Sequence, residues 1–223
     1  MKKDFEYLIG IDEVGRGPLA GPVAVGAFLI PVSNLMKARR IFRGVKESKQ
    51  LSVEKREGWF KVIRNVRKEG LIDFKVAVRS EKVIDGRGLS FAIKAALKSA
   101  LDSLRVVGSR GKISSCKISP ADSRVLLDGG LKAPIEYANQ KTIIKGDEKE
   151  MVIALASICA KVLRDRKLVK FAKQYPLYGF EIHKGYGTRA HYAAIKRLGM
   201  CPLHRRSFLK RLTEVERFFI IPQ

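Results

Sequence analysis

Four acidic residues stand at or just after the ends of short apolar runs. Crowded carboxylates repel one another, so they stay charged together only where cations neutralise them. Hard divalent ions such as Mg²⁺ and Mn²⁺ prefer oxygen ligands, and two of them about 3.5–4 Å apart suit in-line attack on a phosphodiester. The four residues are Asp12 and Glu13 after the run 7–11, Asp128 after 125–127, and Asp147 after 142–144.

Each of the four also has a purely structural explanation. Asp12 and Glu13 can simply lead into the glycine-rich turn that follows them, and Asp128 before Gly129 is ordinary turn chemistry. Asp147 can be a helix cap with an acidic partner three residues later. Only the recurrence of all four after apolar runs favours a shared site.

A sheet would bring these positions together, and the apolar pattern predicts one. Residues 15–22 are too rich in Gly and Pro to be anything but a turn, whereas 105–124 has no pattern that we can assign. Strands that alternate with helices indicate an α/β fold with a mixed sheet, in which function tends to sit at strand ends. Strands are expected at 7–11, 23–30, 71–78, 124–127 and 142–144, and helices at 52–70, 89–104, 149–171, 189–198 and 207–218.

Charge points to a polyanionic partner. The 223 residues include 45 Lys and Arg against 22 Asp and Glu, a formal net charge of +23. Such an excess indicates nucleic acid or an anionic membrane surface. From Lys161 to Gln223 there are 15 basic residues against 4 acidic ones. A solvated helix face explains any single lysine, but so uneven a block favours contact with the phosphates of a duplex.

The remaining composition argues against a membrane protein and a secreted one. The longest apolar run, Met151–Ala160, is about half the roughly 18–20 residues of a membrane helix, and the first residues lack a signal-peptide core. Three cysteines without C-x-x-C spacing fit neither a disulfide framework nor a zinc site. We expect a soluble, cytoplasmic protein with no membrane contact, and a monomer, because heptads and an exposed apolar stripe are missing.

Several segments, in order along the chain, resemble the motifs of bacterial ribonuclease HII. The opening signature Gly10–Pro22 is highly specific, and the resemblance runs from about residue 7 to residue 208. Two departures stand out: Lys46 and Glu47 occupy positions where the family usually has asparagine and aspartate, and 105–124 is longer than expected. The other matching segments are 48–52, 126–129, 145–147, 156–165, 183–188 and 204–208.

The resemblance implies a ribonuclease H-like fold, a five-stranded mixed sheet flanked by helices. It implies a catalytic domain at 1–165 and a C-terminal helical region at 166–223 that grips the substrate. The implied activity is endonucleolytic cleavage of RNA in RNA/DNA hybrids, together with nicking of DNA on the 5′ side of an embedded ribonucleotide, which leaves 3′-hydroxyl and 5′-phosphate ends. The family's catalytic quartet, which holds two Mg²⁺ or Mn²⁺ ions, carries over onto Asp12, Glu13, Asp128 and Asp147.

The resemblance also implies residues that bind the substrate. Gly15, Arg16 and Gly17 match the motif whose backbone reads the ribose 2′-hydroxyl, which distinguishes RNA from DNA. Only glycines let a backbone approach a sugar so closely. Tyr186 matches the tyrosine that stacks on the sugar beyond the scissile bond, and Arg16 is expected at a phosphate. Lys49 is a phosphate contact or an ordinary solvated lysine.

Two other functions remain open from the sequence. A non-catalytic nucleic-acid-binding protein would explain the net charge of +23 without any metal. Another nuclease of the same sheet architecture, such as a junction resolvase or a transposase, would also use clustered carboxylates. Such a nuclease has no reason to carry Gly15, Arg16 and Gly17, or Tyr186.

Overall fold

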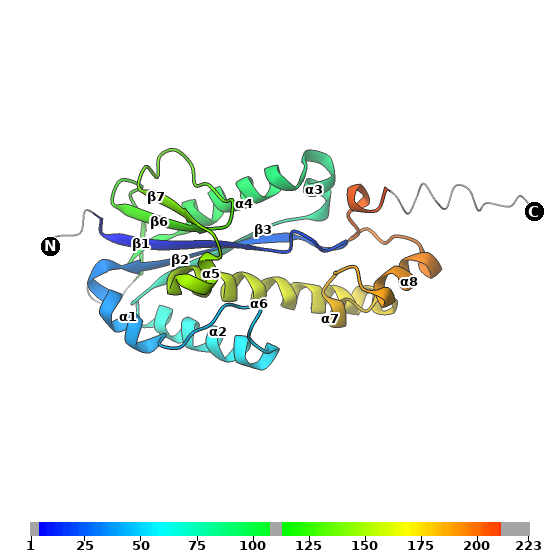
Figure 1. Ribbon diagram of the computed structural model, residues 1–223, viewed down its shortest axis with the longest axis horizontal. Coiled ribbons are helices and arrows are strands. Elements are labelled where there is room, and N and C mark those ends of the chain that lie inside the picture. The colour runs from blue at the N-terminus through cyan, green and yellow to red at the C-terminus, as the bar shows by residue number, and fades with distance from the viewer. Residues whose placement is uncertain (1–4, 108–112, 211–223) are drawn as a thin grey trace, which may run out of the picture.

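The computed structural model describes residues 5–107 and 113–210, and at its centre lies a five-stranded mixed sheet (Figure 1). The strand order is β3-β2-β1-β6-β7; β2 is antiparallel to β1 and β3, while β6 is parallel to β1 and β7. The expected α/β fold with a mixed sheet is thereby confirmed. The strands are β1 (Tyr7–Val14), β2 (Val23–Pro31), β3 (Asp73–Arg79), β6 (Ser123–Asp128) and β7 (Gln140–Ile143), with a separate antiparallel pair of β4 (Arg105–Val107) and β5 (Ile113–Lys117).

Helices cover both faces of the sheet. α4 and α3 lie on one face, and α1, α2 and α6 lie on the other, while α7 and α8 extend beyond one end of the sheet (Figure 1). Among the described residues, no helix combines the length and the apolar character needed to cross a bilayer. The helices are α1 (Leu35–Ile41), α2 (Val53–Lys68), α3 (Glu81–Arg87), α4 (Leu89–Ser103), α5 (Gly146–Lys149), α6 (Met151–Gln174), α7 (Phe180–His183) and α8 (Arg189–Leu198).

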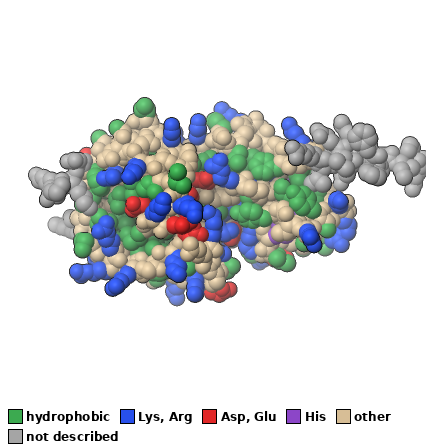
Figure 2. Space-filling model, viewed as in Figure 1, with side chains coloured by type: hydrophobic (Ala, Val, Ile, Leu, Met, Phe, Trp, Pro, Cys, Tyr) green, Lys and Arg blue, Asp and Glu red, His purple; other side chains and the backbone are tan. Residues whose placement is uncertain are grey.

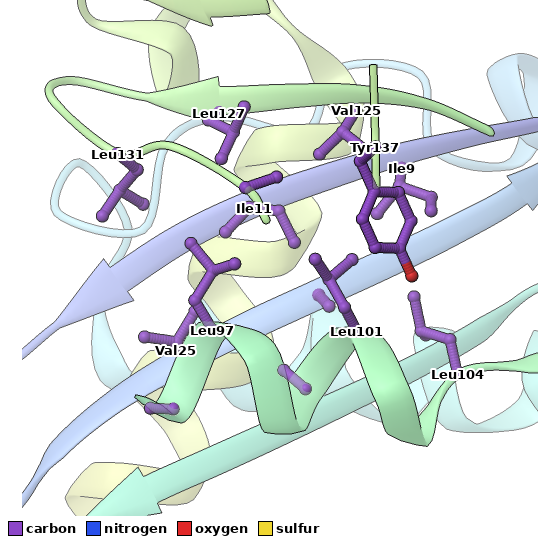
Figure 3. Close-up of a cluster of buried hydrophobic side chains, with 14 of the residues drawn as sticks. Ile9, Ile11, Val25, Leu97, Leu101, Leu104, Val125, Leu127, Leu131 and Tyr137 are labelled. Atoms are coloured by element: carbon purple, nitrogen blue, oxygen red, sulfur yellow. The ribbon is translucent and has the colours of Figure 1, made fainter. Parts of the chain in front are cut away.

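The alternation of side chains along the strands builds a separate core on each face. Ile9 and Ile11 of β1 point toward α4, where they pack with Leu97 and Leu101 (Figure 3). The other face of the sheet packs against α2 and α6, with Phe28 of β2 among its buried side chains. Both cores converge on β1, which is therefore rigidly held in the middle of the molecule.

Two glycines let α6 lie directly on the central strands. A Cβ at Gly10 would stand 2.3 Å from the carbonyl of Val152, and one at Gly26 would stand 2.3 Å from the carbonyl oxygen of Ala156. Gly26 is also the register partner of Asp12. This close contact brings the next residue of α6, Ser157, to the carboxyl of Asp12.

The structure corrects several boundaries. β1 continues to Val14, so Asp12 and Glu13 lie within the strand rather than after it. The unassigned stretch 105–124 contains β4 and β5. The start of the helix expected at 207–218 is instead a 3-10 turn at Arg206–Phe208, and most of that helix lies outside the described residues. α1 and α3 were not expected, because seven residues are too few to establish a helical period.

Candidate active site

Asp12 is deeply buried and lies on the α6 side of β1. Its side chain is 4% exposed, and its Oδ1 accepts a hydrogen bond from the backbone N–H of Glu13 at 2.8 Å. Burial raises the pKa of Asp12 from its ordinary 3.8 to about 8; a hydrogen bond from Ser157 opposes the shift, and the charges of the other three carboxylates reinforce it. A carboxyl in this position is stable as an anion only beside a positive charge.

Glu13 follows Asp12 on the strand, so its side chain leaves from the opposite face. Its Oε1 accepts a hydrogen bond from the Arg16 guanidinium at 2.9 Å, while its Oε2 is buried and has no hydrogen-bond partner among the described residues. Burial raises the pKa of Glu13; Arg16 lowers it, and the charge of Asp128 raises it further. One oxygen of Glu13 is therefore left for a ligand that the chain itself does not supply.

Asp128 and Asp147 are linked by the turn that follows β7. Asp128 ends β6, and its Oδ1 accepts the backbone N–H of Gly146 at 2.6 Å. Asp147 is 4% exposed in the short helix α5, and its Oδ2 is buried without a hydrogen-bond partner. The nearest cation is Lys49, whose Nζ lies 3.6 Å from that oxygen on a side chain that is 78% exposed.

The four expected carboxylates gather near the same end of the central strands. Figure 2 shows a small group of acidic side chains close to α5 with Lys and Arg around it. Within residues 5–107 and 113–210, no three His, Cys, Asp or Glu side chains already stand as a metal-holding group. Oxygen donors with two buried unpaired atoms fit a hard divalent cation.

A fifth carboxylate, which the sequence analysis did not assign to the site, stands beside them. Glu47 is 9% exposed, and burial and the neighbouring charge of Asp147 raise its pKa. The next residue, Ser48, shares a 2.8 Å hydrogen bond between hydroxyls with Ser157 of α6. The Glu47–Lys49 segment is thus part of the wall of the site, and its position next to the matched segment 48–52 was the available signal.

The loop after β1 contains two glycines, and the physical reason for glycine differs between them. Gly15 has φ +95°, and a Cβ there would lie 2.3 Å from Nε of Arg164, so the folded chain itself requires glycine. Gly17 is exposed, its φ is outside the left-handed region, and a Cβ there would have no neighbour within 4 Å. Nothing in the folded chain excludes a side chain at 17, so the glycine leaves room for something that approaches from outside.

Arg205 turns the backbone of this loop outward. Its side chain is fully buried and donates hydrogen bonds to three backbone carbonyls, those of Gly15 at 2.7 Å, Arg16 at 2.9 Å and Gly21 at 2.9 Å. In a trans peptide the N–H points opposite to the C=O. With the carbonyls of Gly15 and Arg16 directed at Arg205, the N–H groups of Arg16 and Gly17 point away from it, and neither donates a hydrogen bond to any described residue.

The loop that carries Tyr186 is joined to the glycine loop. The N–H groups of Leu19 and Ala20 donate to the carbonyl of Gly185 at 2.8 and 3.3 Å. Arg164, also fully buried, donates to the carbonyls of Pro22 at 2.9 Å and Lys184 at 3.2 Å. Tyr186 remains 40% exposed, so its ring stands at the surface of a firmly held backbone. The two sequence-predicted reading elements therefore form one unit.

Cations border this unit on both sides. Arg16, 56% exposed, lines a hollow of about 270 Å³ together with Lys94 and Lys132. On the side of Lys184, a hollow of about 410 Å³ runs between α2 and α6 and includes Arg166. Neither hollow is lined by any of the four carboxylates.

Comparison with known proteins gives a consistent result. Residues 9–211 match the family model "Ribonuclease HII". Ribonuclease HII of Caldicellulosiruptor bescii is 40% identical over 212 residues, which cover 95% of this chain and 91% of the relative. The crystal structure of ribonuclease H2 from Pyrococcus horikoshii OT3 superposes with a TM-score of 0.69 at 27% identity, covering 95% of this chain and 99% of that chain. Bst-RNase HIII in complex with Mn²⁺ shares the fold, with a TM-score of 0.62 at 17% identity over 96% of this chain and 72% of that chain.

Proposed function

Because the chain belongs to the ribonuclease HII family, we infer that it is an endoribonuclease that cuts the RNA of RNA/DNA hybrids. We further propose that it nicks a DNA duplex on the 5′ side of a single embedded ribonucleotide and leaves 3′-hydroxyl and 5′-phosphate ends. The observation that carries this proposal is a pair of buried carboxylate oxygens, Glu13 Oε2 and Asp147 Oδ2, that accept no hydrogen bond from any described residue and lie beside a loop with outward N–H groups.

In this proposal Asp12, Glu13, Asp128 and Asp147 hold two divalent cations, Mg²⁺ or Mn²⁺. When bound, such ions lower the pKa of a water and neutralise the departing 3′-oxygen. The chain contributes the fixed placement of the carboxylates by β1, β6 and α5. Lys49, 3.6 Å from Asp147 on an exposed side chain, balances negative charge and can turn to a phosphate.

Recognition of the ribose follows from the two joined loops. The N–H groups of Arg16 and Gly17 are free to donate to a 2′-hydroxyl, and the missing side chain at Gly17 permits the close approach. Tyr186 stacks on the next sugar, where a deoxyribose fits and a 2′-hydroxyl would collide with the ring. Arg16 contacts a phosphate beside the carboxylates once it leaves Glu13.

The basic residues after Lys161 hold the duplex in this proposal. The proposed division into a catalytic domain at 1–165 and a gripping region at 166–223 has its boundary inside α6, so the two parts share that helix. We also propose that the protein acts in the cytoplasm as a monomer, in keeping with its nucleic-acid substrate and its cysteine content.

The decisive assay uses a DNA duplex with one ribonucleotide, incubated with Mg²⁺, with Mn²⁺ or with a chelator. We expect a single nick on the 5′ side of the ribonucleotide with either metal and none with the chelator. A polymerase should extend the new 3′ end, because it carries a hydroxyl. An all-DNA duplex is the control. Binding without any metal-dependent product would instead support the non-catalytic alternative.

Replacement of Gly17 by alanine separates recognition from folding. The Cβ would meet no atom of the folded chain, so the free energy of unfolding should stay unchanged or rise by about 0.4–1 kcal/mol. Cleavage at a single ribonucleotide should fall by about tenfold, because the methyl group holds the sugar away from the N–H donors. Gly58→Ala, in open space on α2, is the matched control and should leave cleavage unchanged. A Gly17→Ala protein that cuts like the wild type would remove Gly17 from the recognition site.

A further inference from the structure

All three histidines of the chain lie in one cluster behind Tyr186. His191 of α8 is 0% exposed and His204 is 2% exposed, and their Nε2 atoms are 3.1 Å apart. The ring of His183 stacks on that of His191 with centroids 4.2 Å apart. The proposed function assigns no role to the His191–His204 pair. The second nitrogen of each ring lies within hydrogen-bond distance of a backbone group.

A backbone donor fixes the tautomer of His204. The backbone N–H of Cys201 donates to Nδ1 of His204 at 2.9 Å. Because a backbone N–H cannot accept, this Nδ1 carries no proton, and the single proton of the neutral ring is on Nε2. The carbonyl oxygen of Cys201, 3.2 Å from the same Nδ1, is the longer contact and receives no proton from it.

A backbone acceptor fixes the tautomer of His191. Nδ1 of His191 lies 2.9 Å from the carbonyl oxygen of Tyr186, which can only accept, so His191 carries its proton on Nδ1. Its Nε2 then accepts from Nε2–H of His204. Both ends give the same direction, from the N–H of Cys201 through His204 and His191 to Tyr186. The reverse direction would leave two donors facing each other at Cys201 and two acceptors at Tyr186.

This hydrogen-bond relay, from the N–H of Cys201 through His204 and His191 to the Tyr186 carbonyl, requires both rings to be neutral. A second proton on either ring would set two N–H groups against each other. Burial lowers the pKa of His191 to about 4, with the nearby His183 and His204 adding to the shift and the Tyr186 carbonyl opposing it. Burial also lowers the pKa of His204. The other titratable groups around the pair are Cys201 and the ring of Tyr178, 5.1 Å from His204.

We propose that His191 and His204 are positioning residues for Tyr186, which fix its backbone while its ring faces the sugar. This inference rests on the function proposed for Tyr186 above. Because Gly185, with φ +84°, and Gly187 flank Tyr186, this backbone keeps one conformation through its hydrogen bonds rather than through side-chain sterics. The Tyr186 carbonyl also accepts the N–H of Thr188 at 2.9 Å, so loss of the His191 bond removes one of the two donors that fix this carbonyl.

Nitrogen NMR of the full chain labelled with ¹⁵N-histidine tests the relay without reference to activity. At pH 7 we expect a neutral His191 in the Nδ1–H form and a neutral His204 in the Nε2–H form, with His191 still neutral at about pH 5. The opposite tautomer for either ring, or a charged ring at pH 6.5, overturns the relay. Failure here leaves the proposed function intact, whereas a wild type that never cuts at ribonucleotides refutes the proposed function and leaves the tautomers unchanged.

Two variants of nearly equal shape test the effect on Tyr186. His191→Asn keeps an amide N–H for the Tyr186 carbonyl, and His191→Leu does not. We expect the loss of kcat/KM caused by His191→Leu to be about tenfold greater on a single embedded ribonucleotide than on a long hybrid, because Tyr186 is proposed to contact the sugar next to a single ribonucleotide. His191→Asn should stay within about threefold of the wild type on both substrates. Equal losses on the two substrates, or an Asn variant no better than the Leu variant, overturn the positioning role. Should His191→Leu fail to fold, the tautomers of the unmodified chain decide.

Discussion

Asp12→Asn is expected to abolish cleavage while it stabilises the protein. Cleavage should fall by at least about a thousandfold, because an amide cannot replace the central anionic ligand of the proposed metal site. Binding to a hybrid should persist, since Asn retains the oxygen that accepts the N–H of Glu13. Gel shift and cleavage assays on the same hybrid measure the two effects separately.

The stability gain depends on pH in a defined direction. The pKa of Asp12 is about 8 in the folded chain, against 3.8 ordinarily, so the folded state binds more protons than the unfolded state between these values. The free energy of unfolding of the wild type therefore falls as pH rises through this range. The neutral amide of Asp12→Asn has no such penalty, and the variant should exceed the wild type by about 1–3 kcal/mol above pH 8, measured by denaturant unfolding with a chelator present.

A matched control for this substitution lies at the other end of the neighbouring parallel strand, β6. Asp122 is exposed just before β6, far along that strand from Asp128, and Asp122→Asn makes the same change in charge. It should alter neither cleavage nor the pH dependence of stability. Added Mg²⁺ should raise the melting temperature of the wild type and of this control more than that of Asp12→Asn. Normal cleavage by Asp12→Asn would refute the metal role.

Arg205→Met is expected to cause the second-largest loss of cleavage, together with a loss of stability. The change leaves the carbonyls of Gly15, Arg16 and Gly21 without their buried donor, and unsatisfied buried groups cost about 1–3 kcal/mol each. Stability should fall by about 2–4 kcal/mol, and cleavage at a single ribonucleotide by about a hundredfold, because the N–H groups of Arg16 and Gly17 lose their fixed direction. Cleavage is measured at a temperature at which circular dichroism shows the variant to be folded.

Two companion variants separate the loss of the Arg205 clamp, its hydrogen bonds to the carbonyls of Gly15, Arg16 and Gly21, from simple loss of charge. Burial lowers the pKa of Arg205 to about 10, so its side chain is still a cation at neutral pH. Arg206→Met removes the same charge from the next, exposed position and should cost only a modest, salt-dependent loss of binding. Arg205→Lys keeps the charge but not the planar set of donors, and should fall between the two. If Arg205→Met folds and cuts as well as Arg206→Met, the clamp is unimportant.

The parts of the fold that were predictable from sequence are those with local causes. Ser52 accepts the N–H of Lys55 and begins α2, and Thr188 accepts the N–H of His191 and begins α8, as short-range capping patterns indicate. Asp128 and Asp147 were found because strand ends in a sheet meet at one edge. Such signals lie within a few residues of the feature that they predict.

The Arg205 clamp and the histidine relay could not be predicted from the sequence, because their partners are distant in the chain and are mostly backbone groups. Arg205 stands between His204 and Arg206 in a polar run typical of a surface, yet it binds carbonyls about 190 positions earlier, which every residue possesses. His204 binds one ring and one backbone N–H. Backbone partners leave no mark on the choice of amino acid at their own positions, so only a three-dimensional structure identifies them.

The unbroken course of α6 has a consequence for where the strand is cut. Ser157, at the carboxyl of Asp12, and Arg164, which ties the Pro22 and Lys184 carbonyls together, are seven residues apart on this one helix. Seven residues are almost two whole turns, about 10 Å along the axis, so both face the same side. The helix thus sets the distance between the carboxylate site, at Ser157, and the loops proposed to recognise the ribose, at Arg164. Under the proposed function, this helix fixes the offset between the cleaved bond and the recognised nucleotide before any substrate binds.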